Sequence, residues 1–210
     1  MFSIRGHKKL FVCNTRKLTA ITQFLDTILG LPEDMEKVIS LANEMKNVEF
    51  VGLHFHIGSQ ILEMDNFVAL STRINELQDR LEQNGIRNVK NINVGGGLGV
   101  SYNNPDGYPI PDFKAYFGTY AKHLELRPGQ QLHFELGRAV VAQCGSLITK
   151  CLYVKKAATK QFAIVDAGMT DLVRPALYGA YHKIDNLTSN AQEEVYDVVG
   201  PLCDSSDVFV

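Results

Sequence analysis

An alternation of strand and helix patterns in the first two thirds of the chain limits its fold more than any other feature. Short apolar runs typical of buried strands occupy residues 47–55, 89–94 and 131–135. Between these runs, apolar residues recur at helical spacing and predict two helices. The first helix extends from a candidate N-cap at Asp65 to a stop at Gly85, and the second covers 112–124. The first helix should bury Phe67, Leu70, Ile74, Leu77 and Leu81. Strands joined by helical crossovers pair in parallel, so the sequence predicts an α/β fold, either a doubly wound sheet or a (β/α) barrel.

Polar residues and glycines follow the end of each predicted strand. His56 follows the first strand, the run Gly95, Gly96 and Gly97 follows the second, and Glu135 ends the third. In both architectures this edge of the sheet carries the active site, so we expect one shared site. The glycines do not spell the dinucleotide motif GxGxxG. They leave several backbone N–H groups uncovered, which suits a bound phosphate, although a tight turn alone would also use them.

Two histidines one residue apart raise the question of a metal. His54 and His56 would point to the same face of a strand, and together with His133 and Glu135 they could ligate a divalent metal. A metal-dependent barrel hydrolase is therefore one alternative function. The following Gly58 and Ser59 suit an organic ligand and its phosphate better than a metal, so we predict no metal site. We expect His54 to be a core or hydrogen-bonded residue.

Glu135 and Arg138 are close in sequence and open to several interpretations. Glu135 could act as a general base, a metal ligand or the partner of a cofactor nitrogen. Arg138 offers a planar fork for a phosphate or a carboxylate. A structural ion pair between the two is an equal alternative.

Composition restricts the class of partner. The chain has 210 residues, 21 basic and 23 acidic, with like charges dispersed, which gives no electrostatic footprint for nucleic acid or an anionic membrane. The beginning of the chain does not read as a signal peptide, and no apolar run is long enough to span a membrane. The cysteines form neither a zinc motif nor an evident disulfide framework. These features predict a soluble, cytoplasmic protein that acts on a small molecule.

The pattern changes after Arg138. Consecutive strand-like runs, AVVAQCGSLITKCLYV, QFAIVDAG and EEVYDVVG, follow one another with no long helix between them, and the final VFV lies inside another such run. The sequence therefore predicts a second, antiparallel β domain over residues 139–210.

Five ordered motifs resemble one enzyme family. GLHFHIGSQ, NVGGGLG, ELGR, DAGMTDLVRPALYGAYH and GPLCDSSD are similar to the pyridoxal-phosphate-dependent decarboxylases of the alanine racemase-like fold, most closely their diaminopimelate decarboxylase branch. The resemblance implies that residues 1–138 are the C-terminal part of a (β/α)8 TIM-type barrel and that residues 139–210 are an incomplete antiparallel β domain. It also implies a homodimer with a shared active site, which converts meso-2,6-diaminopimelate to L-lysine and CO2.

The resemblance assigns the cofactor, pyridoxal 5'-phosphate, to the strand-end residues. His56 would stack on the pyridine ring, and Ser59 would lie near the phosphate. Glu135 would pair with the pyridine nitrogen, keeping it protonated and the ring a better electron sink. The backbone amides of the glycine run, with Arg138, would bind the phosphate; the residues of that run are Gly95, Gly96 and Gly97.

The same resemblance assigns substrate groups. Arg174 and Tyr178 would hold the distal carboxylate of the diamino acid, with Arg138 also near the substrate. Cys203 would serve the active site of the partner subunit as the acid that reprotonates the α-carbon. Asp204 stands where the family commonly has glutamate, so its contact with the substrate amine would be one methylene shorter.

Departures from the family pattern concern three places. Leu136 replaces the usual proline, so the loop that aims Glu135 loses a fixed φ. Residues 6–31 do not show the family pattern, and a shifted reading frame is one hypothesis for them. The Schiff-base lysine that the family carries upstream has no counterpart, and neither Lys155 nor Lys156 is expected to replace it. We therefore expect the chain as given to be an inactive fragment, and a non-catalytic homologue that acts as a binding protein is the remaining alternative.

Overall fold

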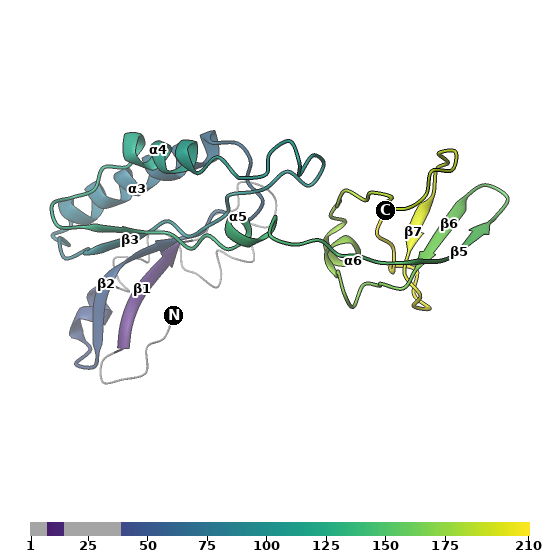
Figure 1. The fold of residues 1–210 in the computed structure, drawn as a ribbon. Coiled ribbons are helices and arrows are strands. Elements are labelled where there is room, and N and C mark those ends of the chain that lie inside the picture. The colour runs from purple at the N-terminus through teal and green to yellow at the C-terminus, as the bar shows by residue number, and fades with distance from the viewer. Residues whose placement is uncertain (1–7, 15–38) are drawn as a thin grey trace. The chain divides into compact units, whose positions relative to one another are not determined.

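Two compact units make up the part of the chain that the structure describes. This computed structural model describes residues 8–14 and 39–210. The first unit contains the described residues up to Val100 together with Ile110–Ala142, and the second contains Ser101–Pro109 and Gln143–Val210 (Figure 1). The domain boundary between residues 138 and 139 stays a prediction.

The first unit is built on a parallel sheet with the strand order β1-β2-β3-β4. Every neighbouring pair is parallel, and Gly52 of β2 lies opposite Asn91 of β3. The parallel pairing predicted from the strand and helix alternation is therefore confirmed. Closure into an eight-stranded barrel stays a prediction. The strands are β1 (Lys8–Asn14), β2 (Val48–Phe55), β3 (Asn91–Asn93) and β4 (Gln131–His133).

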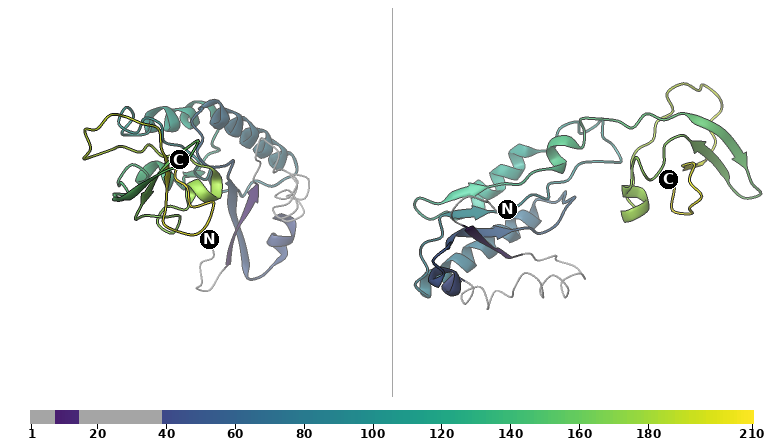
Figure 2. Two further views of the ribbon diagram at one scale, coloured as in Figure 1. Left: turned by 90° about the vertical axis from the view of Figure 1, so that its right-hand side faces the viewer. Right: turned by 90° about the horizontal axis from the view of Figure 1, so that it is seen from below.

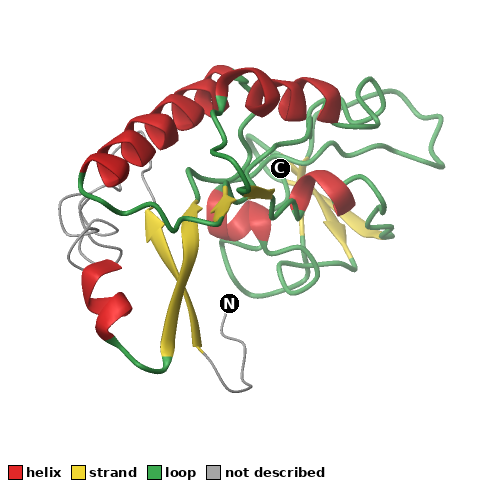
Figure 3. Ribbon diagram, turned by 90° about the vertical axis from the view of Figure 1, so that its left-hand side faces the viewer, coloured by secondary structure: helices red, strands yellow, loops and turns green. Residues whose placement is uncertain are grey.

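Two helices, α3 (Asp65–Gln83) and α4 (Phe113–His123), run along one side of this sheet (Figure 1, Figure 3). The predicted N-cap at Asp65 is wrong, because Met64 occupies the cap without a side-chain hydrogen bond and Asp65 is the first helical residue. Its carboxylate still lies in the first turn, where the helix dipole favours a negative charge. The five predicted apolar residues of α3 are all buried, which confirms its orientation; they are Phe67, Leu70, Ile74, Leu77 and Leu81.

Capping and aromatic packing explain why α4 lies where it does. The Asp112 carboxylate accepts a hydrogen bond from the Ala115 N–H at 2.8 Å, which satisfies one of the unpaired donors at the helix start. Tyr116 is fully buried, with its ring centroid 4.8 Å from that of Phe67 in an edge-to-face contact. The ring of Phe134, just after β4, lies tilted against Tyr116, with the ring centroids 5.8 Å apart. This cluster fixes the segment that leads into Glu135.

The short helix α5 (Arg138–Val141) corrects one prediction. The residues AVV were expected to begin a strand-like run, but the Ala142 N–H donates to the Arg138 carbonyl at 2.9 Å and closes a helical turn. Ala139 is 6% exposed and packs in the core of the first unit. That tertiary contact overrides the strand preference of the two valines.

The second unit contains a three-stranded sheet with the order β5-β6-β7, seen in green and yellow in Figure 2. The strands are β5 (Cys151–Lys156), β6 (Gln161–Val165) and β7 (Asp197–Val199). The β5 and β6 pair is antiparallel, as expected, but β6 and β7 are parallel. The prediction of an antiparallel sheet is therefore wrong for this pair. The long connection after β6 contains α6 (Arg174–Tyr178) and returns the chain to the end of the sheet at which β6 begins, as parallel pairing of β6 and β7 requires.

The last residues of the chain also pair with this sheet. The Val198 N–H donates to the Val210 carbonyl, and the Phe209 N–H donates to the Val198 carbonyl, each at 2.8 Å. The strand-like run predicted for VFV thus lies antiparallel to β7, with a bridge between Val199 and Val208. Within residues 8–14 and 39–210, no helix has the length and apolar character needed to cross a membrane.

Candidate active site

Three strand ends of the first unit meet at Glu135. Asn93, the last residue of β3, donates a hydrogen bond from Nδ2 to Glu135 Oε1 at 2.8 Å. Its Oδ1 accepts the Gly95 N–H at 2.8 Å, which fixes the amide orientation. The other carboxylate oxygen of Glu135 lies 3.4 Å from Nε2 of His54, from β2. Asn93 therefore links the Glu135 carboxylate to the main chain of Gly95. Sequence reasoning missed it, although a polar residue inside an apolar strand was a usable signal.

Gly95 and Gly96 are closely packed against the main chain at neighbouring strand ends. A Cβ on Gly95 would lie 2.4 Å from the Phe55 carbonyl oxygen, and one on Gly96 would lie 2.3 Å from the Glu135 carbonyl oxygen. Both glycines are buried, so close packing alone accounts for the absence of side chains. The N–H groups of Gly96 and Gly97 nevertheless donate to no acceptor among the described residues. The two interpretations offered by the sequence, a tight turn and a phosphate cradle, are thus compatible.

A loop after β2 lies beside the glycine run. The Ile61 N–H donates to the Gly97 carbonyl at 2.8 Å. Gln60 adopts a left-handed conformation, with φ of 63°, and its Nε2 donates to the Val100 carbonyl at 2.6 Å. In the same loop, Ser59 Oγ accepts a hydrogen bond from Arg138 Nη2 at 2.9 Å. The structure therefore brings the predicted residues Ser59 and Arg138 together.

The environment of His56 favours the neutral ring. Burial lowers the pKa of His56 from its ordinary value of 6.5, the nearby His54 lowers it further, and the Glu135 carboxylate raises it. Burial disfavours the imidazolium, and a second imidazolium would repel it. The ring is thus mainly uncharged at pH 7, in a state suited to stacking.

We expect an NMR titration of the His56 ring protons to give a pKa below 6.5. His54→Gln should raise this pKa, and Glu135→Gln should lower it, since the first removes a repulsive charge and the second an attractive one. In the unfolded chain His56 has its ordinary pKa of 6.5, and in the folded chain its pKa is lower. Between these two values the unfolded chain binds more protons, so the free energy of unfolding should fall as the pH decreases through that range. Shifts in the opposite directions would contradict this electrostatic account.

The proposed metal ligands are not gathered around one point. His133 Nε2 lies 2.9 Å from Asn91 Oδ1, so this ring is engaged with an amide. His54 is half-buried, and its Nε2 has no hydrogen-bond partner within the described segments. Over those same segments, no group of three or more His, Cys, Asp or Glu side chains is placed to hold a metal ion. The geometry gives the metal alternative no support there.

In the second unit, Arg174 is held by two rings. Its Nη1 lies 2.9 Å from Nε2 of His182, and its guanidinium carbon lies 4.6 Å from the centroid of the Tyr102 ring. The His182 and Tyr102 rings contact each other edge to face at 4.5 Å. Tyr178, at the other end of α6, is 71% exposed. Sequence reasoning assigned a role to neither supporting ring: His182 ends the motif that holds Arg174, and Tyr102 lies in a distant segment.

Cys203 and Asp204 lie in the loop that follows β7. The Cys203 thiol is free and exposed. Asp204 Oδ1 accepts hydrogen bonds from the Ser206 hydroxyl at 2.6 Å and from the Ser206 N–H at 2.8 Å. These bonds, the hydroxyl first, lower the pKa of the Asp204 carboxyl. The predicted site residues thus form two sets, one in each unit.

A sequence model of one family matches residues 10–210, and its description is pyridoxal-dependent decarboxylase, C-terminal sheet domain. The chain belongs to the pyridoxal-dependent decarboxylases. This family uses pyridoxal phosphate, and its members are lyases. The resemblance predicted from the five motifs is confirmed.

Relatives within these decarboxylases are closely similar. The diaminopimelate decarboxylase of Bacteroides thetaiotaomicron is 66% identical over 177 residues, which are 84% of this chain and 46% of the relative. The Haemophilus influenzae diaminopimelate decarboxylase is 38% identical over 83% of this chain and 41% of its own length. The chain therefore spans less than half the length of these relatives.

Solved structures of the pyridoxal-dependent decarboxylases show the same fold. A mutant diaminopimelate decarboxylase from Helicobacter pylori, complexed with L-lysine, has a TM-score of 0.74 and 37% identity over 85% of this chain and 43% of its own. The Methanocaldococcus enzyme, also with L-lysine, has a TM-score of 0.77 and 30% identity over 97% of this chain and 49% of its own. The α/β fold and its sheets agree with this family.

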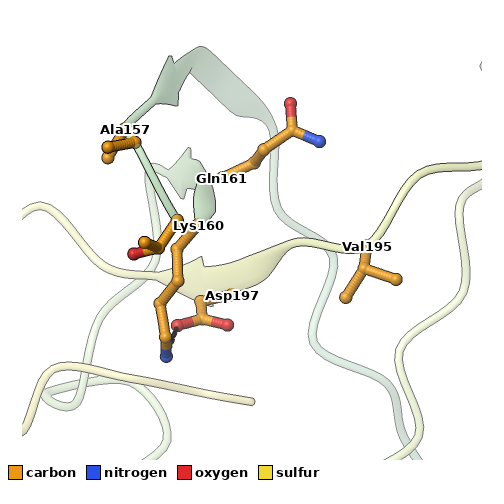
Figure 4. A pocket seen from close by; sticks show the side chains of 7 residues that line it. Ala157, Lys160, Gln161, Val195 and Asp197 are labelled. Carbon is orange, nitrogen blue, oxygen red and sulfur yellow. Dashed lines mark hydrogen bonds and ion pairs between the residues drawn. The ribbon is translucent and has the colours of Figure 1, made fainter.

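The second unit also has a surface hollow. It has a volume of about 530 Å³ and lies beside the turn between β5 and β6 (Figure 4). Lys160 points across it to Asp197, and the Nζ to Oδ2 distance is 2.7 Å. The remaining lining residues are small or uncharged: Ala157, Ala158, Thr159, Gln161 and Val195. The cation is already paired, so the hollow offers no catalytic group.

Proposed function

We propose that this chain is part of a decarboxylase that removes CO2 from the D-centre of meso-2,6-diaminopimelate and yields L-lysine in lysine biosynthesis. The 66% identity with the Bacteroides enzyme supports this substrate. We further propose that the complete protein is a cytoplasmic homodimer and that its barrel is eight-stranded. Alone, the chain is proposed to be inactive, because it has no counterpart of the Schiff-base lysine.

The strand ends of the first unit fit pyridoxal phosphate. The observation that carries the proposal is the pair of N–H groups, on Gly96 and Gly97, that donate to no described acceptor beside the Glu135 cluster. Ser59 and Arg138, in contact with each other, supply a hydroxyl and a planar cation for the same phosphate. When bound, the cofactor supplies an electron sink for the carbon that loses CO2.

The polar side chains of the first unit would orient that cofactor. Glu135 would hold a proton at the pyridine nitrogen through its carboxylate. Asn93 keeps that carboxylate in place through the bond to Oε1, even though Leu136 replaces the usual proline. The uncharged His56 ring would cover one face of the pyridine without repelling its positive charge.

Groups of the second unit would select the diamino acid. Arg174 and Tyr178 would bind the distal carboxylate, a group that a diamine-forming decarboxylase has no reason to recognise. Asp204 would bind the distal amine, and its lowered pKa keeps it ionised for that contact. Cys203 would donate the proton that replaces CO2 at the α-carbon, in the active site of the partner subunit.

Reading the DNA upstream of Met1 and through the first 35 codons, in all three frames, is the first test of this proposal. A strand-end lysine motif there, in frame or one shift away, would supply the missing residue. The longer protein should then release CO2 from meso-2,6-diaminopimelate when pyridoxal phosphate is added. Absence of such a lysine would exclude decarboxylation.

Two further measurements separate the alternatives. A longer protein that folds but retains no pyridoxal phosphate after dialysis would support a non-catalytic binding protein. Stoichiometric zinc in a folded preparation, measured by elemental analysis, would instead support a metal-dependent hydrolase. Decarboxylation without bound zinc would reject both.

A further inference from the structure

Asp207 joins two loops of the second unit through one buried carboxylate. The residue is 2% exposed. Its Oδ1 accepts the Met169 N–H at 2.6 Å, and its Oδ2 accepts the Leu202 N–H at 2.9 Å. Its main-chain carbonyl accepts the Gly200 N–H at 2.9 Å. One carboxylate thus bonds the backbone of a segment 38 residues away and that of its own loop.

Two glycines leave the room that this carboxylate occupies. A Cβ on Gly200 would lie 2.2 Å from Asp207 Oδ2, so a larger residue there would displace the carboxylate. A Cβ on Gly168 would lie 3.1 Å from Oδ1, which is a milder collision. Because protein interiors are close-packed, both loops are shaped around Asp207.

The two loops carry the groups proposed to handle the substrate. Met169 begins the segment that leads into α6, whose first residue is Arg174. Leu202 directly precedes Cys203, and the Asp204 carbonyl accepts the Asp207 N–H at 3.2 Å. The bonds of Asp207 therefore end next to Cys203 on one side and at the start of the Arg174 segment on the other.

We propose that Asp207 is a positioning residue, which holds the Cys203 loop against the segment that leads to Arg174. The use of these loops in decarboxylation rests on the function proposed above, but their coupling through Asp207 does not. Asp207 itself touches neither substrate nor cofactor in this proposal.

Physical chemistry explains why a carboxylate serves this role. Hydrogen bonds to an ionised acceptor are roughly twice as strong as those between neutral groups. A buried carboxylate without donors is costly, so Asp207 and the two N–H groups stabilise one another and one loop arrangement. An asparagine has nearly the same shape, but its NH2 group cannot accept a hydrogen bond. At least one of the two loop contacts must then break.

Amide hydrogen exchange distinguishes positioning from a general contribution to stability. The Met169 and Leu202 N–H groups are held by the Asp207 carboxylate, whereas the paired strands β5 and β6 of the same unit lie outside the two loops. A locally released loop should speed exchange at Met169 or Leu202 alone. General unfolding should speed exchange in β5 and β6 as well.

The experiment compares the 210-residue chain with its Asp207→Asn variant. Both proteins are transferred to D2O, and amide exchange is followed by peptide mass spectrometry. We expect exchange at Met169 or Leu202 to speed up by more than about twofold, with β5 and β6 within about twofold of the parent chain, because only the local opening changes. Asp185→Asn, at an exposed carboxylate paired with Lys183, is the matched control and should leave all rates unchanged.

Two outcomes would overturn the proposal. One is exchange at both Met169 and Leu202 within about twofold of the parent chain in the folded Asp207→Asn variant. If that variant unfolds, the milder Gly168→Ala is measured instead, and failure to speed exchange at Met169 or Leu202 selectively would reject the coupling. Neither result depends on decarboxylase activity, so failure of the proposed function would leave this conclusion unchanged.

Discussion

Gly96→Ala is expected to destabilise the first unit by about 3 kcal/mol or more. The added Cβ would lie 2.3 Å from the carbonyl oxygen of Glu135 and 3.1 Å from its carbonyl carbon. These are main-chain atoms, so no flexible side chain can move aside, and the cost should reach or exceed the upper end of the range for overpacked cores. The segment that carries Glu135 would have to shift away from Asn93.

Urea denaturation followed by circular dichroism measures this effect. Gly118→Ala is the matched control, because Gly118 lies within α4 and a Cβ there meets nothing within 4 Å. That change should stabilise the chain by up to about 1 kcal/mol, since alanine favours a helix over glycine. Equal effects of the two substitutions would contradict the close approach seen at Gly96.

Local periodicity explains which parts of the fold could be predicted. Parallel strands and crossover helices follow from spacing within each segment, and α3 buries the face that its sequence predicts. The direction of β7 could not be read in this way, because it depends on the path of the long connection from β6. The helical turn at Ala139 depends on burial against other segments, which local preference does not record.

In the candidate site, too, some residues could be predicted from the sequence and others could not. Residues at strand ends could be predicted because parallel sheets gather them at one edge, and Glu135 is indeed hydrogen-bonded from β3. Supporting residues such as His182 and Asp207 could not be predicted, and for Asn93 the sequence offered only a polar residue inside an apolar strand. Their roles arise from hydrogen bonds to groups on other segments, as in the 38-residue separation between Asp207 and Met169. For Asp207, the sequence shows only an aspartate before the apolar run VFV.

In the longer decarboxylase proposed above, Arg174→Lys is expected to raise the KM for meso-2,6-diaminopimelate by about 30-fold. Truncating one partner of a hydrogen-bonded charge pair costs roughly 2–5 kcal/mol, and the lower end applies here because lysine retains the positive charge. Lysine keeps the charge but loses the planar group that lies over Tyr102 and bonds His182. The ammonium would therefore be held less firmly and would offer the carboxylate no bidentate contact.

The effect should fall on KM more than on kcat, because the distal carboxylate is unchanged by loss of CO2 at the other end of the substrate. An interaction that is equal in the ground state and the transition state contributes to binding alone. Arg87→Lys, at an exposed position of the first unit, is the matched control and should alter neither constant. A fall in kcat at constant KM would instead place Arg174 at the reacting carbon, and the proposed preference for a substrate with two carboxylates would need another explanation.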